Sequence, residues 1–313
     1  MKKLLIATTA LVATAGVAAA DVKLSGYGRF GLDYHGDRGT VGVGGPAGAK
    51  TQVNMRMRVN IDGSVTTDSG VTFGGRIRMQ SSTNSNDATL NAAMLYGSYA
   101  GLRMEVGNSN NAFDSAALMY NSEMGYLDRS FGDPIDVGLS YASTPGSANK
   151  MGIFARYSFG DGSVRMSYVN PDQRVASHPA GTKNEVSISA DYKFGQFTVS
   201  GAYGSNLNGT SGHKGYFIGA EYAVNSDVNV GLLHFRDKPA NVAQTRTTLY
   251  GNFSQGAMTY RGYIARDNLA ANATKTAFGL GLDYDLGGAR LSADVHRNYA
   301  KKTRAGVGVR FDF

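Results

Sequence analysis

Apolar and polar side chains alternate with a period of two along most of this chain. The alternation is clearest in the last ten residues, where one face carries Ala305, Val307, Val309, Phe311 and Phe313. Similar segments run over residues 21–35, 52–62 and 71–80. Successive side chains of a β-strand point to opposite faces, so each segment has one apolar face and one polar face. The pattern predicts an all-β protein.

Two kinds of connection alternate between these segments. The short ones contain Gly, Asp or Asn, which tolerate the positive φ values of tight hairpins, and they fall at 67–70, 100–101, 160–162, 195–196, 225–227, 254–256 and 287–288. The longer polar loops fall at about 36–50, 81–88, 108–149, 170–184, 205–214, 236–245, 266–275 and 297–303. These fifteen connections join sixteen strands. An even strand number with one short and one long set of connections is typical of bacterial outer-membrane barrels.

The apolar faces of so many strands need a place away from water. No apolar run after the N-terminal segment is long enough for a membrane-spanning helix. Lipid allows no open sheet edge, so a membrane sheet has to close, and the strand from Asp21 is expected to pair with the last strand. A soluble β-sandwich would also alternate, but it would not favour the strict rhythm of short and long connections. We predict a transmembrane antiparallel β-barrel of sixteen strands.

The first twenty residues have the features of a secretory signal. Lys2 and Lys3 precede an apolar run over 4–17, and small residues follow at 18–20. The pattern predicts a signal peptide over 1–20, cleavage between Ala20 and Asp21, and a single barrel domain over 21–313. Loss of the two lysines lowers the formal net charge from +7 to +5.

Several classes of site are excluded or disfavoured by composition. The chain has no cysteine, and its five histidines show no metal-ligand spacing. Its basic residues are scattered singly, which argues against a nucleic-acid partner. We expect no cofactor, and only a structural Ca²⁺ between loop acids stays open, because hard cations prefer carboxylate oxygens.

Four segments resemble the general diffusion porins of Gram-negative outer membranes, and they lie at 22–26, 66–74, 102–108 and 311–313. The resemblance covers essentially the whole chain after residue 20. It implies a homotrimer in the bacterial outer membrane, a third loop folded into the lumen, and a terminal aromatic signal read by the barrel-assembly machinery. Phe311 and Phe313 would carry that signal. Outer-membrane lipid and lipopolysaccharide would surround the barrel.

The third long loop is the first candidate for a functional site, because a loop of this length is usually functional. Its acids are Asp114, Glu123, Asp128, Asp133 and Asp136. The polar faces of the first three strands carry a basic set, of which we select Arg29, Arg56, Arg58, Arg76 and Arg78. If the loop folds inward, acids face bases across the pore, and the charges of this constriction set ion selectivity.

These features favour a channel for passive diffusion of small hydrophilic solutes and ions. A substrate-specific channel is the nearest alternative. A barrel enzyme would need a site such as Ser292, Asp294 and His296, which share one face of a strand, and an adhesin would act through its loops. Small residues on the apolar face would allow another barrel wall to approach closely, namely Gly26, Gly28, Gly75 and Gly97.

Overall fold

The computed structural model describes residues 21–39, 48–83, 88–135, 138, 150–239 and 243–313. The predicted signal peptide, with Ala20, lies outside these residues, and Asp21 is the first residue of β1. The strands are β1 (Asp21–His35), β2 (Thr51–Thr66), β3 (Thr72–Ser82), β4 (Thr89–Leu90), β5 (Met94–Tyr99), β6 (Leu102–Gly107), β7 (Met151–Phe159), β8 (Gly162–Asn170), β9 (Glu185–Phe194), β10 (Phe197–Ser205), β11 (Lys214–Ala223), β12 (Val228–Lys238), β13 (Gln244–Gln255), β14 (Met258–Asp267), β15 (Thr276–Asp285), β16 (Arg290–Arg297) and β17 (Thr303–Asp312). A 3₁₀ turn, η1, spans Leu207–Gly209.

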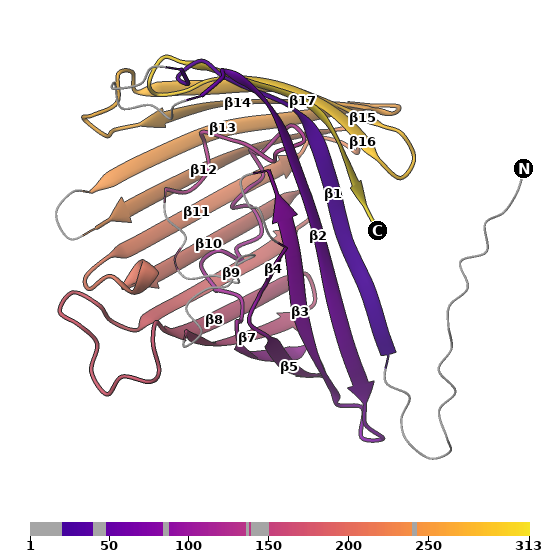
Figure 1. Ribbon diagram of the computed structural model, residues 1–313, viewed down its shortest axis with the longest axis vertical. Helices are drawn as coiled ribbons and strands as arrows, with labels where there is room; N and C mark the ends of the chain where they lie inside the picture. Colours follow the sequence, from indigo (N-terminus) through magenta and orange to yellow (C-terminus); the bar gives the residue numbers. More distant parts are fainter. Residues whose placement is uncertain (1–20, 40–47, 84–87, 136–137, 139–149, 240–242) are drawn as a thin grey trace, which may run out of the picture.

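The strands form one closed antiparallel barrel (Figure 1). Each strand pairs with its neighbours in the chain, and β1 also pairs with β17, from Tyr27 opposite Asp312 to His35 opposite Arg304. Both β4 and β5 pair with β3, so they are one strand interrupted at 91–93. Counted in this way the barrel has sixteen strands, which confirms the predicted number and the predicted closure.

The outer surface of the barrel is apolar, as the alternation predicts. Leu24 in β1, Ile218 in β11 and Leu280 in β15 are each more than 60% exposed. Such a surface is stable only when lipid covers it. Among the described residues, no helix is both long and apolar enough to cross a membrane.

The hydrophobic core lies inside the barrel, where the loop between β6 and β7 packs on the inner wall (Figure 1). We call the described part of this loop, 108–135, the inner loop. Its Phe113, Leu118 and Met119 are buried in one cluster with inward side chains of β11 and β12, including Phe217 and Phe235. Apolar residues at these inward positions interrupt the simple alternation, because this stretch of wall faces the loop and not water.

The last residues of the chain seal the barrel against β1. Phe313 donates from its backbone nitrogen to Gly26 (3.0 Å) and accepts from the Gly26 nitrogen (2.7 Å). A Cβ at Gly26 would lie 3.0 Å from the Phe313 ring, and one at Gly28 would lie 2.3 Å from the Phe311 ring. The two glycines therefore make room for the chain's own terminal rings. This corrects the expectation that Gly26 and Gly28 leave open space for a neighbouring wall.

Candidate functional site: the pore constriction

The inner loop is fixed first on the inward polar side chains of β8 and β9. The backbone nitrogen of Ala112 donates to the Ser167 hydroxyl (2.9 Å), and that of Phe113 donates to the Ser187 hydroxyl (3.1 Å). The backbone nitrogen of Ala117 donates to the carboxylate of Asp191 in β9 (2.8 Å). These loop nitrogens have no strand partner, because the loop is not part of the sheet. Short polar side chains at inward strand positions accept their hydrogen bonds instead.

A second set of bonds fixes the end of the inner loop on β13, β14 and the connection after β16. Phe131 donates from its nitrogen to the Tyr263 hydroxyl (2.9 Å), and its carbonyl accepts from the Tyr299 hydroxyl (3.0 Å). Thr248 donates to the Gly132 carbonyl (2.9 Å). The inner loop is therefore bound at both ends and along its apolar face, which makes it part of the wall.

Between these two anchors, the inner loop turns at Asp128 and meets β16, β17 and β1. Asp128 has a φ of 50°, and its carboxylate reaches Arg29 (3.6 Å), Arg290 (3.2 Å) and Arg310. Arg29 also donates to the carbonyl of Leu127 (3.0 Å). One carboxylate is thus shared by three guanidinium groups, of which Arg290 also lies 3.7 Å from Asp283 and Arg310 lies 3.4 Å from Asp312.

The same three arginines belong to a row that crosses four strands. Arg290 is the direct partner of Arg310, Arg310 of Arg29, and Arg29 of Arg56. We call these four residues the arginine row. Like charges placed directly opposite each other destabilise a sheet, so a row of this kind needs a compensating anion. Asp128 supplies one from the inner loop.

Tyr27, two residues before Arg29 on the same face of β1, serves as a platform for neighbouring guanidinium groups. Arg58 lies 5.0 Å and Arg310 lies 4.4 Å from the centre of its ring. Arg56 donates to its hydroxyl (3.3 Å). Stacking on an aromatic face holds guanidinium groups in fixed positions without neutralising their charge.

The other predicted arginines lie on β2 and β3 and have neighbours across the strand pair. Arg58 donates twice to Gln80 (2.7 and 2.9 Å), and Arg78 donates to Asn60 (2.9 Å). Arg76 forms an ion pair with Asp62 (2.7 Å). Arg58 and Arg78 thus each donate to an amide oxygen, whereas Arg76 binds a carboxylate.

The predicted loop acids do not form one uniform surface. Asp114 accepts a hydrogen bond from the Tyr120 hydroxyl, Asp128 joins the arginine row, and Asp136 lies outside the described residues. Burial, reinforced by the charges of Asp133 and Asp128, raises the pKa of Glu123 to about 9. Burial likewise raises the pKa of Asp133 to about 7. Near neutral pH, Glu123 is therefore protonated.

Several residues of this site were absent from the predicted set. Arg290 and Arg310 complete the arginine row, and Tyr27 supports it. A signal for Arg310 was available, since it shares the polar face of the last strand, which has to pair with β1. The sequence signal for Arg290 is weaker. It consists only of the position of Arg290 at the start of a strand, after the turn at Gly287–Gly288.

The residues considered for enzyme chemistry are held in other contacts. One ring nitrogen of His296 lies 2.9 Å from Asp294 and the other lies 3.0 Å from the Tyr263 hydroxyl. Both ring nitrogens are occupied, so His296 is not placed to activate Ser292. In the part of the chain that the structure describes, no three His, Cys, Asp or Glu side chains are grouped to hold a metal ion.

The chain has counterparts among known proteins. The family model for Gram-negative porins matches residues 7–310. A porin of Fuscovulum blasticum is 39% identical, with 94% of this chain and all of the relative covered. A porin of Rhodobacter capsulatus is 25% identical over the same shares.

Solved porin structures also resemble this chain. Two engineered mutants of Rhodopseudomonas blastica porin superpose with a TM-score of 0.86 at 37% and 38% identity, each covering 94% of this chain and all of the solved one. The chain therefore belongs to the Gram-negative porin family and is a β-barrel channel of the bacterial outer membrane.

Proposed function

We propose that small hydrophilic solutes and ions pass unchanged through a constriction between the inner loop and the basic wall of β1, β2, β3, β16 and β17. The observation that carries this proposal is the arginine row, in which one loop carboxylate, Asp128, is shared by Arg29, Arg290 and Arg310. The inner loop is anchored on β8, β9, β13 and β14 and meets the arginine row at Asp128, so the loop and the row are held in fixed positions.

The charges of this constriction favour anions. Asp128, Asp283 and Asp312 balance part of the charge of Arg29, Arg290 and Arg310, but Arg261 also pairs with Asp283 (2.8 Å), and Arg56 and Arg58 add positive charge beside Tyr27. Glu123, with its raised pKa, adds no negative charge at pH 7. Selectivity in a pore follows the charges at its narrowest place, where screening is least.

Conductance in planar lipid bilayers tests the proposed function. The purified chain should give stable, ohmic current steps, and the reversal potential in a salt gradient should show anion preference at pH 7. That preference should weaken as the pH rises through about 9, where Glu123 loses its proton. Absence of current steps would contradict the channel mechanism. Saturable flux of a single solute would instead favour the substrate-specific alternative.

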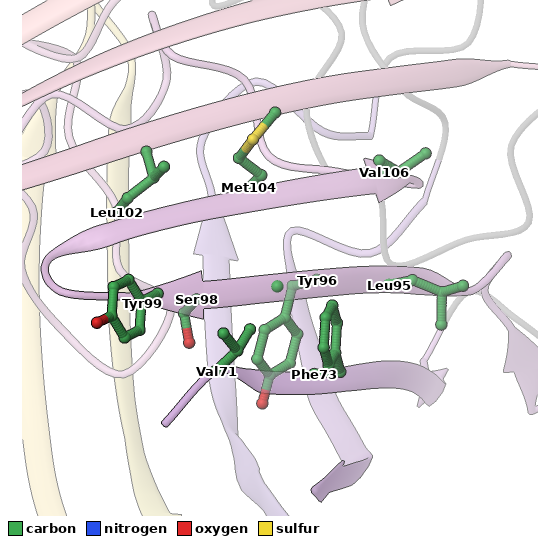
Figure 2. Close-up of a pocket in the computed structure, with 10 residues that line it drawn as sticks. Val71, Phe73, Leu95, Tyr96, Ser98, Tyr99, Leu102, Met104 and Val106 are labelled. Atoms are coloured by element: carbon green, nitrogen blue, oxygen red, sulfur yellow. The ribbon is translucent and has the colours of Figure 1, made fainter. Parts of the chain in front are cut away.

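The outer wall of β3, β5 and β6 supports the proposal that the chain forms a homotrimer. A shallow apolar groove of about 500 Å³ lies on this wall, and Phe73, Leu95 and Met104 are among the residues that line it (Figure 2). Gly97 also lines it, and its direct strand partners are Phe73 and Met104. Gly75, another of the predicted small residues, lies under the Leu95 side chain, since a Cβ there would come within 2.7 Å of it. Gly97 therefore remains as the place where a neighbouring wall can approach closely.

Filling this groove should weaken association of the subunits. A Cβ at Gly97 would meet the Phe73 ring at 3.4 Å, an ordinary contact, so Gly97→Leu should leave the barrel intact while it pushes the neighbouring wall away. Native mass measurement should give three chains for the unchanged protein and mainly single chains for Gly97→Leu. A matched control is Gly262→Leu, which adds the same side chain to the outer wall of β14, also at 3.4 Å from its nearest neighbour. Equal trimer content in both variants would contradict this interface.

Two further partners belong to this proposal. The exposed terminal ring of Phe313, together with Phe311, is suited to recognition by the barrel-assembly machinery before the barrel closes. The apolar outer wall is suited to contact with outer-membrane lipid and lipopolysaccharide.

A further inference from the structure

One aromatic ring of the inner loop lies directly against the place where the barrel closes. Tyr126 is fully buried, and its ring packs on Gly31 of β1 and on Gly306 and Gly308 of β17. A Cβ would lie 2.9 Å from this ring at Gly31, 3.2 Å at Gly306 and 2.7 Å at Gly308. We call these three glycines the glycine socket, because side chains at their positions would occupy the space of the ring.

The glycine socket is formed by the first and the last strand of the barrel together. Gly31 supplies one part of it from β1 and is the direct partner of Gly308 in β17. Neither strand alone encloses the ring. The ring of Tyr126 therefore takes this position only in the closed barrel.

The residues that follow the ring are bound by the same two strands. Arg129 donates to Asp33 of β1 (2.6 Å). Asp128 pairs with Arg29 of β1 (3.6 Å) and with Arg310 of β17. This part of the inner loop thus crosses the β1–β17 seam on the lumen side, with the buried ring at its beginning.

The buried ring is better suited to fix this part of the loop than the ion pairs are. The Asp128 side chain is 31% exposed, and ion pairs that face water contribute little to holding a position. Its φ of 50° is unfavourable for a residue with a Cβ, so the surroundings have to maintain the turn. Complete burial of an aromatic ring two residues away supplies a much stronger restraint.

We propose that Tyr126 is the positioning residue of the constriction, and that its ring in the glycine socket holds the Asp128 carboxylate at the arginine row. The charge pattern of the constriction is then completed only when β1 and β17 have paired. This inference rests on the proposed function, in which Asp128 and the arginine row set the ion selectivity.

Reversal potentials in a salt gradient test the inference through a double-mutant cycle. Asp128→Asn removes one negative charge from the row, and a charge about 8 Å from an ion changes ion preference about two-fold, here toward anions. Tyr126→Ala should shift the reversal potential in the same direction by up to about two-fold in ion preference, because the carboxylate leaves the guanidinium groups for water, which screens it. In the Asp128→Asn background, Tyr126→Ala should add almost nothing, since the charge that it would displace is already absent.

The conservative variant Tyr126→Phe should restore the reversal potential of the unchanged protein. The Tyr126 hydroxyl is buried, and among the described residues it has no hydrogen-bond partner. The shape of the ring, rather than a hydrogen bond, is therefore what the glycine socket holds.

A matched control removes a buried side chain from another pair of glycines. Leu207 is fully buried over Gly204 and Gly215, which are direct partners on β10 and β11. These two strands carry no residue of the arginine row, so Leu207→Ala should leave the reversal potential unchanged. Stable current steps in every variant show that the barrel has folded.

Four outcomes would overturn the inference: an unchanged reversal potential in Tyr126→Ala, an equal shift with and without the Asp128 carboxylate, a shift in Tyr126→Phe as large as in Tyr126→Ala, or an equal shift in Leu207→Ala. If Asp128→Asn itself has no effect, the proposed selectivity of the arginine row fails, and this inference fails with it. A shift in Asp128→Asn without one in Tyr126→Ala would reject only the role of the ring.

Discussion

Replacing the four arginines of β2 and β3 by alanine should move the reversal potential strongly toward cation selectivity. The four residues are Arg56, Arg58, Arg76 and Arg78. A charge about 8 Å from an ion in water contributes about 0.5 kcal/mol, so each loss changes ion preference about two-fold and four together change it on the order of ten-fold. Loss of Arg76 also leaves the carboxylate of Asp62 without its partner at 2.7 Å. The shift should be largest at low ionic strength. Four long side chains also leave the lumen, so larger solutes should pass.

Matched lysine replacements at the same four positions provide the control, because they keep the charge and most of the length. Their reversal potential should stay close to that of the unchanged channel. An alanine variant with unchanged reversal potential and unchanged size limit would show that these arginines lie away from the narrowest part of the pore.

Deleting Phe313 should reduce the yield of assembled barrel in the outer membrane about ten-fold while export continues. The deletion removes both backbone hydrogen bonds between Phe313 and Gly26 and the ring that lies over Gly26. Unpaired backbone groups at the barrel seam are costly in lipid. Quantifying folded barrel in isolated outer membranes, and unfolded chain in the periplasm, measures both effects.

Phe313→Ala separates the aromatic signal from barrel closure, because it keeps the backbone bonds and removes only the ring. We expect an assembly defect here as well, whereas Leu291→Ala, which shortens another exposed apolar side chain of the outer wall, should assemble normally. Normal yield in the deletion would contradict the role of Phe313 altogether. Normal yield in Phe313→Ala with a defect in the deletion would assign the effect to the backbone seam alone.

The barrel could be predicted from sequence because each of its determinants is local. Period-two alternation assigns the faces of a strand, short polar turns mark its ends, and the absence of lipid-exposed edges requires closure. The interruption at 91–93 could not be predicted in this way. It depends on tertiary contacts, in which the Asn91 nitrogen donates to the Arg78 carbonyl and the Asn108 nitrogen to the Ala93 carbonyl.

The path of the inner loop depends on interactions between distant parts of the chain. Inward apolar residues such as Phe217 and Phe235 select the wall on which the loop packs, but within their own strands they look like irregularities of the alternation. The positive φ of Asp128 turns its carboxylate toward the arginine row, and acid content alone gave no sign of that. The positions of Arg290 and Arg29 along the barrel axis depend on the stagger between neighbouring strands. The sequence of one strand does not determine that stagger.

The location of the constriction is tested most directly by thiol modification of single-cysteine proteins during current recording, which is clean here because the chain has no cysteine. Glu123→Cys places the thiol on the inner loop and Arg56→Cys places it on the facing wall, while Met57→Cys, on the exposed outer face, is the control. A bulky charged thiol reagent should lower single-channel conductance by roughly half or more at positions 123 and 56, because the proposed constriction lies between them, and it should leave the current unchanged at position 57. An inner-loop cysteine that stays unlabelled, or that is labelled without any change in current, would contradict a pore bounded by this loop and the arginine wall.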